Sequence, residues 1–191
     1  MNLLCAVQQL TDGEICLKPV CARDAKDLFT LVNRDRVYLR EWLPWLDRNR
    51  SVQDTLDFIE LSEKQFDKKD ALQVCIRFRD EIAGVIGFHH FDWDNRSASI
   101  GYWLAQNLQG NAIVTRSCRL LLNFAFTELQ LNRVEIRCAL ENKKSRAIPE
   151  RLGFTNEGTV RDGEWLYNKF VTLAVYGILS REWPVKPKKA D

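Results

Sequence analysis

A loop with the residue types of an anion-binding site lies between residues 106 and 112. It reads Gln106-Asn107-Leu108-Gln109-Gly110-Asn111-Ala112 and separates a strand-like run from a helical pattern. A helix N-terminus offers unpaired N–H groups and the positive end of the helix dipole, and both attract anions. Strand–loop–helix junctions with one glycine are also common as ordinary turns. The segment alone therefore leaves two interpretations open, a phosphate-binding loop and a plain turn.

The two histidines of the chain, His89 and His90, are adjacent in a strand-like run. Neighbouring residues of a regular strand point to opposite faces, so we expect no metal ion bound by both. One of them can face a substrate cleft and accept a proton, while the alternative is a structural role for each.

Six cysteines stand in the chain without a CxxC pair and without a histidine at metal-ligand spacing. Several lie in apolar runs, where cysteine behaves as a small hydrophobic residue. We expect free thiols in a reducing compartment and no metal site. The cysteines are Cys5, Cys16, Cys21, Cys75, Cys118 and Cys138.

An aromatic segment between Val37 and Leu46 contains Tyr38, Trp42 and Trp45 and is interrupted by Pro44. It is either a packed loop between two helices or part of the wall of a pocket, because ligand pockets are rich in aromatic side chains.

The rest of the sequence supplies the elements that must position these residues. Apolar spacings of three and four predict helices, and Ser51 with Asp54 forms a capping-box variant. The predicted helices cover Asp24–Arg34, a segment from Ser51, Ala112–Leu129 and Lys143–Leu152. The predicted strands are Ile15–Val20, Leu72–Arg79, Ile82–Phe91, Ala98–Leu104, Val134–Leu140, Phe154–Val160 and Phe170–Leu179.

This order predicts one α+β (mixed α/β) domain over residues 1–183, followed by a disordered basic tail at 184–191. The chain has 28 Lys and Arg against 26 Asp and Glu, a formal net charge of +2. That balance argues against a nucleic-acid-binding protein, which usually carries a strongly basic face. We see no signal peptide and no apolar run approaching the roughly 20 residues of a membrane span, so we expect a cytoplasmic protein.

The element order resembles that of the GNAT superfamily of acetyltransferases. The short sequence motifs resemble those of its RimJ/RimL branch of ribosomal-protein acetyltransferases. Each matching piece is weak alone, but together they run in order from about residue 15 to Trp183. The pieces are Trp42-Leu43-Pro44-Trp45, Ile86-Gly87-Phe88, Ile100-Gly101-Tyr102-Trp103-Leu104, Gln109-Gly110, Asn132-Arg133-Val134-Glu135-Ile136-Arg137, Asn142-Lys143-Lys144-Ser145-Arg146-Ala147, Arg151-Leu152-Gly153-Phe154 and Glu164-Trp165. The resemblance implies a central, mostly antiparallel sheet of six to seven strands flanked by about four helices.

In the resembled family, backbone amides of a Gln/Arg-x-x-Gly-x-Gly/Ala loop grip the pyrophosphate of acetyl-CoA. The resemblance assigns that role to Gln109, Gly110, Asn111, Ala112, Ile113 and Val114. Ala112 stands where glycine is expected, and at positive φ an alanine costs about 1 kcal/mol of strain. Asn111 replaces the usual basic residue, for which the nearby arginines at positions 116, 119 and 146 are candidate substitutes.

The resemblance also assigns the catalytic groups. The expected fourth-strand carboxylate is missing from Ser97–Ile100, and the expected helix tyrosine is Pro149. Both absences are features of the RimL-like branch, which relies on a serine and a distant glutamate. Ser145 matches the serine that hydrogen-bonds the departing sulfur, and Glu164 matches the glutamate that serves as base. Asn142 matches a cofactor contact and can also be an ordinary N-cap.

We therefore predict transfer of an acetyl group from acetyl-CoA to a primary amine by direct attack, without a metal and without an acyl-enzyme. By resemblance the acceptor is a protein N-terminus of ribosomal type, and a small amine stays open. Tyr38, Trp42, Trp45 and His89 are expected to contact the acceptor, and Cys138 lies near the expected thioester. Dimers are common in this branch. The alternative is an inactive relative that binds a CoA-like ligand or a protein partner, because of Ala112 and Asn111.

Overall fold

The computed structural model of the chain describes residue 7 and residues 10–184. The predicted basic tail at 184–191 lies outside the described residues except for Pro184, and Cys5 lies outside them as well.

A single seven-stranded sheet runs through the described part of the chain, in the order β1-β2-β3-β4-β5-β7-β6. Neighbouring strands are antiparallel throughout except for the parallel pair β4 and β5. This confirms the predicted mostly antiparallel sheet. The strands are β1 (Ile15–Pro19), β2 (Leu72–Phe78), β3 (Glu81–Asp92), β4 (Ser97–Leu104), β5 (Arg133–Ala139), β6 (Thr155–Leu166) and β7 (Lys169–Leu179).

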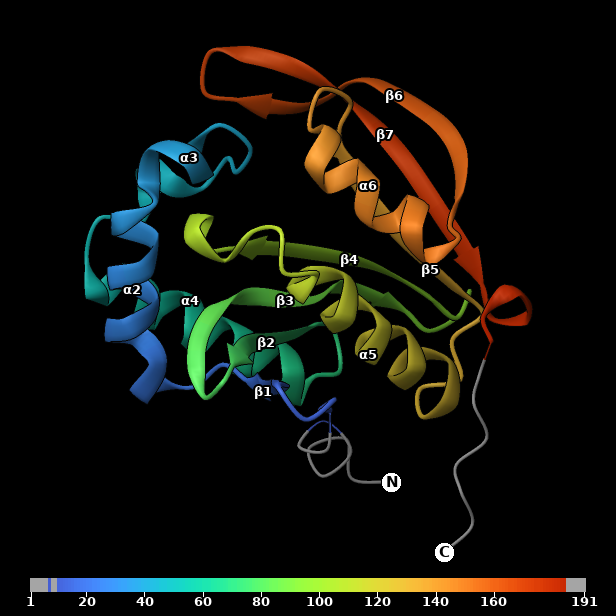
Figure 1. Cartoon of the computed structure of the whole chain (residues 1–191), viewed down its shortest axis with the longest axis horizontal. Coiled ribbons are helices and arrows are strands. Elements are labelled where there is room, and N and C mark those ends of the chain that lie inside the picture. Colours follow the sequence, from blue (N-terminus) through green and yellow to red (C-terminus); the bar gives the residue numbers. More distant parts are fainter. Residues whose placement is uncertain (1–6, 8–9, 185–191) are drawn as a thin grey trace, which may run out of the picture.

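Helices cover both faces of this sheet (Figure 1). They are α2 (Ala25–Arg34), α3 (Arg36–Arg40), α4 (Val52–Asp67), α5 (Ile113–Thr127) and α6 (Lys143–Leu152). Alternation along β2 divides the core: Ile76 packs in the cluster that holds Leu121 of α5. Cys75 points the other way and packs with Leu28 of α2 and Ile59 of α4. Among the described residues the four longer helices match the predicted ones, while the short α3 occupies the aromatic segment.

The pairing of β4 with β5 is confined to four residues at one end. Ser97 to Ile100 face Arg133 to Ile136, and beyond that point the two strands separate. β4 stays bound to β3 as far as Leu104, and β5 stays bound to β7 as far as Ala139. The sheet is therefore split between its two halves, and strand backbone lines both sides of the split.

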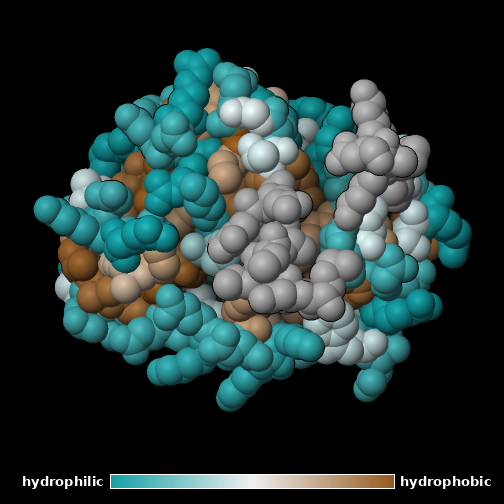
Figure 2. All heavy atoms as spheres, turned by 90° about the horizontal axis from the view of Figure 1, so that it is seen from below, coloured by the Kyte–Doolittle hydropathy of each residue, from teal (hydrophilic) through white to brown (hydrophobic). Residues whose placement is uncertain are grey.

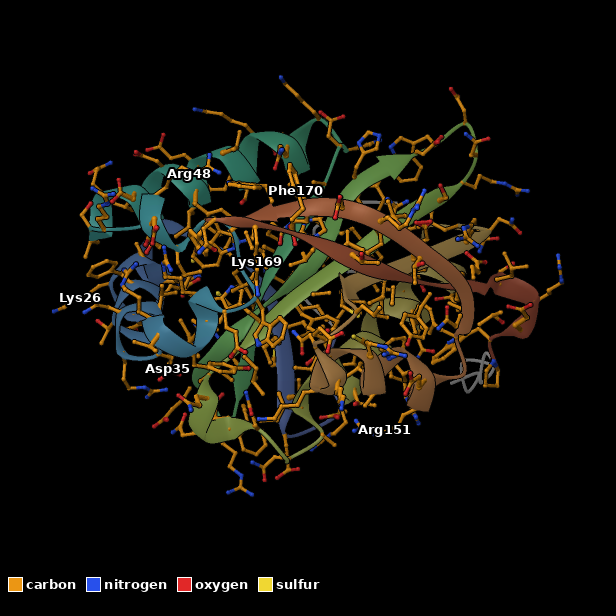
Figure 3. The ribbon with its side chains drawn as sticks, turned by 90° about the horizontal axis from the view of Figure 1, so that it is seen from above. Lys26, Asp35, Arg48, Arg151, Lys169 and Phe170 are labelled. Carbon is orange, nitrogen blue, oxygen red and sulfur yellow. The ribbon has the colours of Figure 1, made fainter. Side chains whose placement is uncertain are left out.

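The β6–β7 hairpin is longer than predicted. The expected strands stopped at Val160 and resumed at Phe170, but the pairing continues to Leu166 and restarts at Lys169. The sequence around Asp162 is turn-like, yet Asp162, at φ 51°, lies within a β-bulge of β6. Seen from above, the hairpin crosses over the sheet toward α3 (Figure 3).

The tip of this hairpin contacts the segment after α3. The Tyr167 hydroxyl donates to the backbone oxygen of Leu43 at 2.5 Å. The Arg40 guanidinium lies 3.7 Å from the centre of the Tyr167 ring. Two segments far apart in sequence are thus joined above the split of the sheet.

Seen from below, the surface outside the grey atoms is mostly hydrophilic, with hydrophobic side chains visible between polar ones (Figure 2).

The predicted capping box at the start of α4 is confirmed. The Ser51 hydroxyl accepts from the Asp54 N–H at 3.2 Å, and the Asp54 carboxylate accepts from the Ser51 N–H at 2.8 Å. The capping box fixes where α4 begins, and one side of α4 faces the split sheet.

Replacing Ser51 by alanine removes one side of this box, so we expect the free energy of unfolding to fall by about 1 kcal/mol. Urea denaturation measures the change. Ser51→Asp, which keeps an acceptor at the cap, is the matched control and should stay within about 0.5 kcal/mol of the parent. Equal losses in both variants would contradict a capping role.

Candidate active site

A cleft of about 1590 Å³ occupies the split between β4 and β5. Its walls come from the aromatic segment, α4, β3, β4, β5, the N-termini of α5 and α6, and β6. In the view from above, Arg48 lies on one side of the crossing hairpin and Arg151 of α6 on the other (Figure 3). The cleft thus brings together chain segments that are far apart in the sequence.

The loop before α5 has the strained conformation that its sequence suggested. Ala112 is the N-cap of α5 and lies in the left-handed region, at φ 54° and ψ 14°. Gly110, at φ 83°, is also left-handed, and there the absence of a Cβ makes the conformation easy. Ala112 provides no side-chain cap, so the first-turn N–H groups of α5 remain available to the cleft.

Five of the six predicted loop residues line the cleft: Gln109, Gly110, Ala112, Ile113 and Val114. The sixth, Asn111, has its side-chain amide turned back into the loop. It donates to the backbone oxygens of Leu108, at 3.1 Å, and Gln109, at 3.3 Å. The Asn111 side chain therefore stabilises the loop itself.

Two cations of α6 at the cleft were missed by the sequence analysis. Lys144 and Arg151 both line it, and the Lys144 ammonium donates to the Gln109 side chain at 2.9 Å. They are seven residues apart on α6, a spacing of about two turns that places them on one side of the helix. That spacing was a usable signal.

The arginines considered in their place are engaged elsewhere. Arg116 binds Asp12 and Glu14, and Arg146 donates to the Tyr176 hydroxyl at 3.0 Å. Arg119 is exposed and is not among the residues that line the cleft.

Ser145 lies in the first turn of α6, and Asn142 is its N-cap. The Asn142 side-chain oxygen accepts from the Ser145 N–H at 3.0 Å. The Ser145 Oγ lies 3.1 Å from the hydroxyl of Tyr102, which comes from β4 on the opposite wall. Asn142, Ser145 and Tyr102 all line the cleft. Tyr102 was not singled out from the sequence.

Glu164 faces the cleft from β6, next to the bulge that follows Val160. Burial raises the pKa of its carboxyl, as a base operating near neutral pH requires. The cleft therefore contains the Glu164 carboxylate of the hairpin and the Ser145 hydroxyl of α6.

His89 also lines the cleft and sits in a β-bulge of β3. Desolvation lowers the pKa of its imidazole, which favours the neutral form. Its ring lies over Gly101, where a Cβ would stand 1.8 Å from the His89 Nε2. Glycine at position 101 is therefore what admits the imidazole.

The aromatic segment forms one wall of the cleft. Tyr38, Trp42 and Trp45 all line it, and Trp45 lies 6.4 Å from Trp103 of β4, ring centre to ring centre. Tyr38 and Gln109 line the same cleft, so this wall lies beside the loop before α5.

One side of α4 completes the cleft, and the sequence analysis did not predict it. Asp54, Asp57, Phe58 and Leu61 line the cleft at spacings of three and four. Phe58 is 39% exposed and Leu61 is 55% exposed, which is unusual for such large apolar side chains. We call Phe58 and Leu61 the α4 stripe.

Among the described residues, no group of three or more His, Cys, Asp or Glu is arranged to hold a metal ion. No helix in the described ranges is long and apolar enough to cross a membrane. Cys138 lines the cleft as a free thiol, and burial raises its pKa.

The sequence also matches a known protein family over most of its length. Residues 14–155 match the family described as Acetyltransferase (GNAT) domain. The chain belongs to this family. The seven-stranded sheet, split between β4 and β5, is the GNAT-like fold that the resemblance implied, and the match confirms an acetyl-CoA-dependent N-acetyltransferase.

Individual relatives agree. This GNAT chain is 38% identical over 163 residues to "Putative ribosomal N-acetyltransferase YdaF" of Bacillus subtilis (strain 168), covering 84% of this chain and 88% of that protein. It is 28% identical over 160 residues to "Ribosomal-protein-serine acetyltransferase" of Escherichia coli (strain K12), covering 84% and 89%. It also resembles the solved structure of the microcin C7 self immunity acetyltransferase MccE in complex with acetyl-CoA and AMP. The TM-score is 0.85 at 31% identity, covering 90% of this chain and 94% of the other.

Replacing Ala112 by glycine should relieve the left-handed strain of the GNAT loop. The strain is roughly 1–2 kcal/mol, and the greater freedom of glycine in the unfolded chain offsets about 0.4–1 kcal/mol. We expect the free energy of unfolding to rise by up to about 1 kcal/mol. Because the loop already holds this conformation, the Kd for acetyl-CoA should change by less than about threefold.

Denaturation and calorimetric titration measure these two quantities. Gly110→Ala is the matched control, since it introduces the same strain at φ 83° and should lower stability. Tightening of acetyl-CoA binding by more than about tenfold in Ala112→Gly would contradict the expectation and show that the alanine methyl crowds the cofactor.

Proposed function

We propose that this enzyme acetylates the N-terminal amine of a polypeptide, with a ribosomal protein as the acceptor type. The observation that carries the proposal is the α4 stripe, an exposed apolar surface in the cleft wall. A polypeptide continues beyond its reacting amine and can cover Phe58 and Leu61, whereas a polyamine offers little apolar surface. The names of the two relatives support the ribosomal type of acceptor.

Acetyl-CoA is proposed to bind at the loop before α5. The uncapped first turn of α5 supplies N–H groups and the positive end of a helix dipole for the pyrophosphate. Gln109, Gly110, Ala112, Ile113 and Val114 form this site, with Lys144 and Arg151 as the neighbouring cations. Asn111 supports the loop from within through its side chain. Asn142 caps α6 beside it by accepting from the Ser145 N–H, and its side-chain NH2 group is proposed to contact the cofactor.

The chemistry is proposed as direct attack of the amine on the thioester. Glu164 accepts the proton of the acceptor ammonium, either directly or through water. The carbon–sulfur bond breaks as the carbon–nitrogen bond forms, and the electron pair stays with sulfur. Ser145 donates a hydrogen bond to the departing sulfur. Cys138 takes no covalent part, because its raised pKa disfavours the nucleophilic thiolate.

The acceptor is proposed to approach from the α4 side, across the hairpin from Arg151 (Figure 3). Tyr38, Trp42 and Trp45 form the wall beside the acceptor, and His89 lies on the floor of the cleft. A neutral imidazole there avoids repulsion of the incoming ammonium.

We also propose that the enzyme is a cytoplasmic homodimer. Trp165 and Phe170 form an exposed aromatic pair on the hairpin, 51% and 58% exposed with ring centres 4.7 Å apart. Exposed apolar surface of this kind favours a protein partner. The inactive binding-protein alternative rests on Ala112 alone, since the Asn111 side chain is already used within the loop.

Replacing Glu164 by glutamine removes the proposed base and should lower kcat by about 10²-fold or more. In the parent enzyme kcat should rise with pH as Glu164 deprotonates. Because burial raises the pKa of Glu164, the midpoint of this rise in kcat should lie above the pKa of roughly 4.3 of an ordinary glutamate. Steady-state kinetics from pH 5 to 9 should show the limb in the parent and not in the variant.

The matched control is Asp162→Asn, a carboxylate two residues away on the same strand that does not line the cleft. It should retain the parent kcat and the parent pH profile. An unchanged profile in Glu164→Gln would assign the base to another group, with His89 as the next candidate.

Acceptor choice tests the α4 stripe. Peptides that begin with serine or alanine should have a kcat/KM at least about tenfold above that of a polyamine. Phe58→Ala should raise the peptide KM by about tenfold at constant kcat, since part of a side-chain burial of roughly 1.5–3 kcal/mol is lost. Val37→Ala, at a residue that is 91% exposed and outside the cleft, is the control. A polyamine preference, or an unchanged KM, would reject the polypeptide acceptor.

A further inference from the structure

We infer that Tyr102 is a positioning residue, whose hydroxyl holds Ser145 so that the serine proton points at the departing sulfur. The inference rests on the proposed role of Ser145 and goes beyond it, because it supplies the group that orients the serine.

The geometry brings one tyrosine to one serine across the split sheet. Tyr102 lies on β4 just past Ile100, where the pairing with β5 has ended. Its hydroxyl lies 3.1 Å from the Ser145 Oγ and 3.2 Å from the Ser145 backbone oxygen. Both contacts join β4 to the first turn of α6, the two walls of the cleft. No other chain segment has to move for the tyrosine to act on the serine.

Either hydroxyl can donate in this contact, and the phenol can also donate to the Ser145 backbone oxygen; we assign the phenol proton to the Ser145 Oγ. Burial raises the pKa of Tyr102 well above that of a free tyrosine, so the phenol keeps its proton at neutral pH. Its oxygen is partly buried among the side chains of the cleft and has Ser145 as its hydrogen-bond partner. When Tyr102 donates to the Ser145 Oγ, the serine hydrogen is not needed for that contact. It is then free to be donated to a third atom.

The other contacts of Ser145 do not determine which atom receives its hydroxyl hydrogen. The Ser145 N–H is already bound by the Asn142 side chain at 3.0 Å. The thiol of Cys138, which lines the same cleft, is a second polar neighbour of Ser145. The hydroxyl of a serine with two polar neighbours can turn toward either one. A donor that hydrogen-bonds to its oxygen restricts this rotation. Tyr102 provides that fixed donor, which makes the hydroxyl of Ser145 a directed one.

The step balances without a proton leaving either side chain. The amine forms its bond to the acetyl carbon, the carbon–sulfur bond breaks, and sulfur keeps the electron pair. Ser145 stabilises that charge by its hydrogen bond, and Tyr102 strengthens the serine as a donor because hydrogen bonds in a chain polarise one another. After the attack the nitrogen gives its second proton to water, and the thiolate takes its proton from water after it leaves, so neither Tyr102 nor Ser145 becomes an anion.

This arrangement also accounts for Pro149 on α6. That position in the resembled family provides a tyrosine hydroxyl from the helix, and proline has no such group. Here a tyrosine hydroxyl reaches the first turn of the same helix from β4. It contacts Ser145, however, so we assign it a role through the serine.

The test is a double-mutant cycle with Tyr102→Phe and Ser145→Ala. Tyr102→Phe keeps the ring and removes the hydroxyl, and we expect kcat to fall about tenfold, the equivalent of one hydrogen bond. The KM values for acetyl-CoA and for the acceptor should stay within about twofold. Adding Tyr102→Phe to Ser145→Ala should lower kcat no further, because the tyrosine has lost the group through which it acts.

The matched control is Tyr176→Phe. Tyr176 is a buried tyrosine whose hydroxyl donates to Glu150 of α6 at 2.7 Å, and it does not line the cleft. A purely structural loosening of α6 would lower kcat in both tyrosine variants. The proposal requires Tyr176→Phe to keep the parent kcat even where its Tm falls.

Each remaining outcome is decisive. A parental kcat in Tyr102→Phe, or a further drop of about tenfold in the double variant, overturns the positioning role, and the second result would make Tyr102 act on sulfur directly. A parental kcat in Ser145→Ala overturns both this inference and the proposed role of the serine. The assay uses whichever acceptor the enzyme accepts, so failure of the polypeptide proposal leaves this test intact.

Discussion

The separation of β4 from β5 is the constraint on which the rest of the molecule depends. Parallel pairing holds the two strands together only from Ser97 to Ile100, so two halves of one sheet diverge from a common origin. In a continuous sheet the backbone beyond Ile100 would bind a neighbouring strand. Here that backbone faces a cleft, and each wall is stiffened by antiparallel strands behind it. The fold thus offers unpaired polar groups to a ligand without a mobile loop.

Among the described non-glycine residues that line the cleft, Ala112 alone has a positive φ. Ala112 stays left-handed because Ile113 and Val114, which follow it, are buried in the core and anchor the start of α5. Strained backbone persists where its surroundings determine it, and here the core does so. The consequence is an open helix N-terminus aimed into the cleft. An N-cap with a side-chain acceptor would use one of those N–H groups itself.

Much of this could be predicted from the sequence, and the misses have physical reasons. Periodicity gave the helices, and the order of elements gave the largely antiparallel sheet. The length of the β6–β7 hairpin was missed, because a bulge and a turn look alike around Asp162. The role of Tyr102 could not be derived, since nothing local relates it to Ser145, 43 residues away. The α4 stripe was not predicted, because apolar spacing shows that a helix has a face and not what another side of the helix meets.

The contact at the hairpin tip affects how an acceptor can reach the cleft. Tyr167 is bonded to Leu43, so the arm crossing the sheet is fastened at its far end and forms an arch. A chain end can pass beneath an arch, whereas the middle of a folded polypeptide cannot be threaded through without opening it. An acceptor that has to pass under the arch must therefore present a chain end, before any of its side chains is recognised.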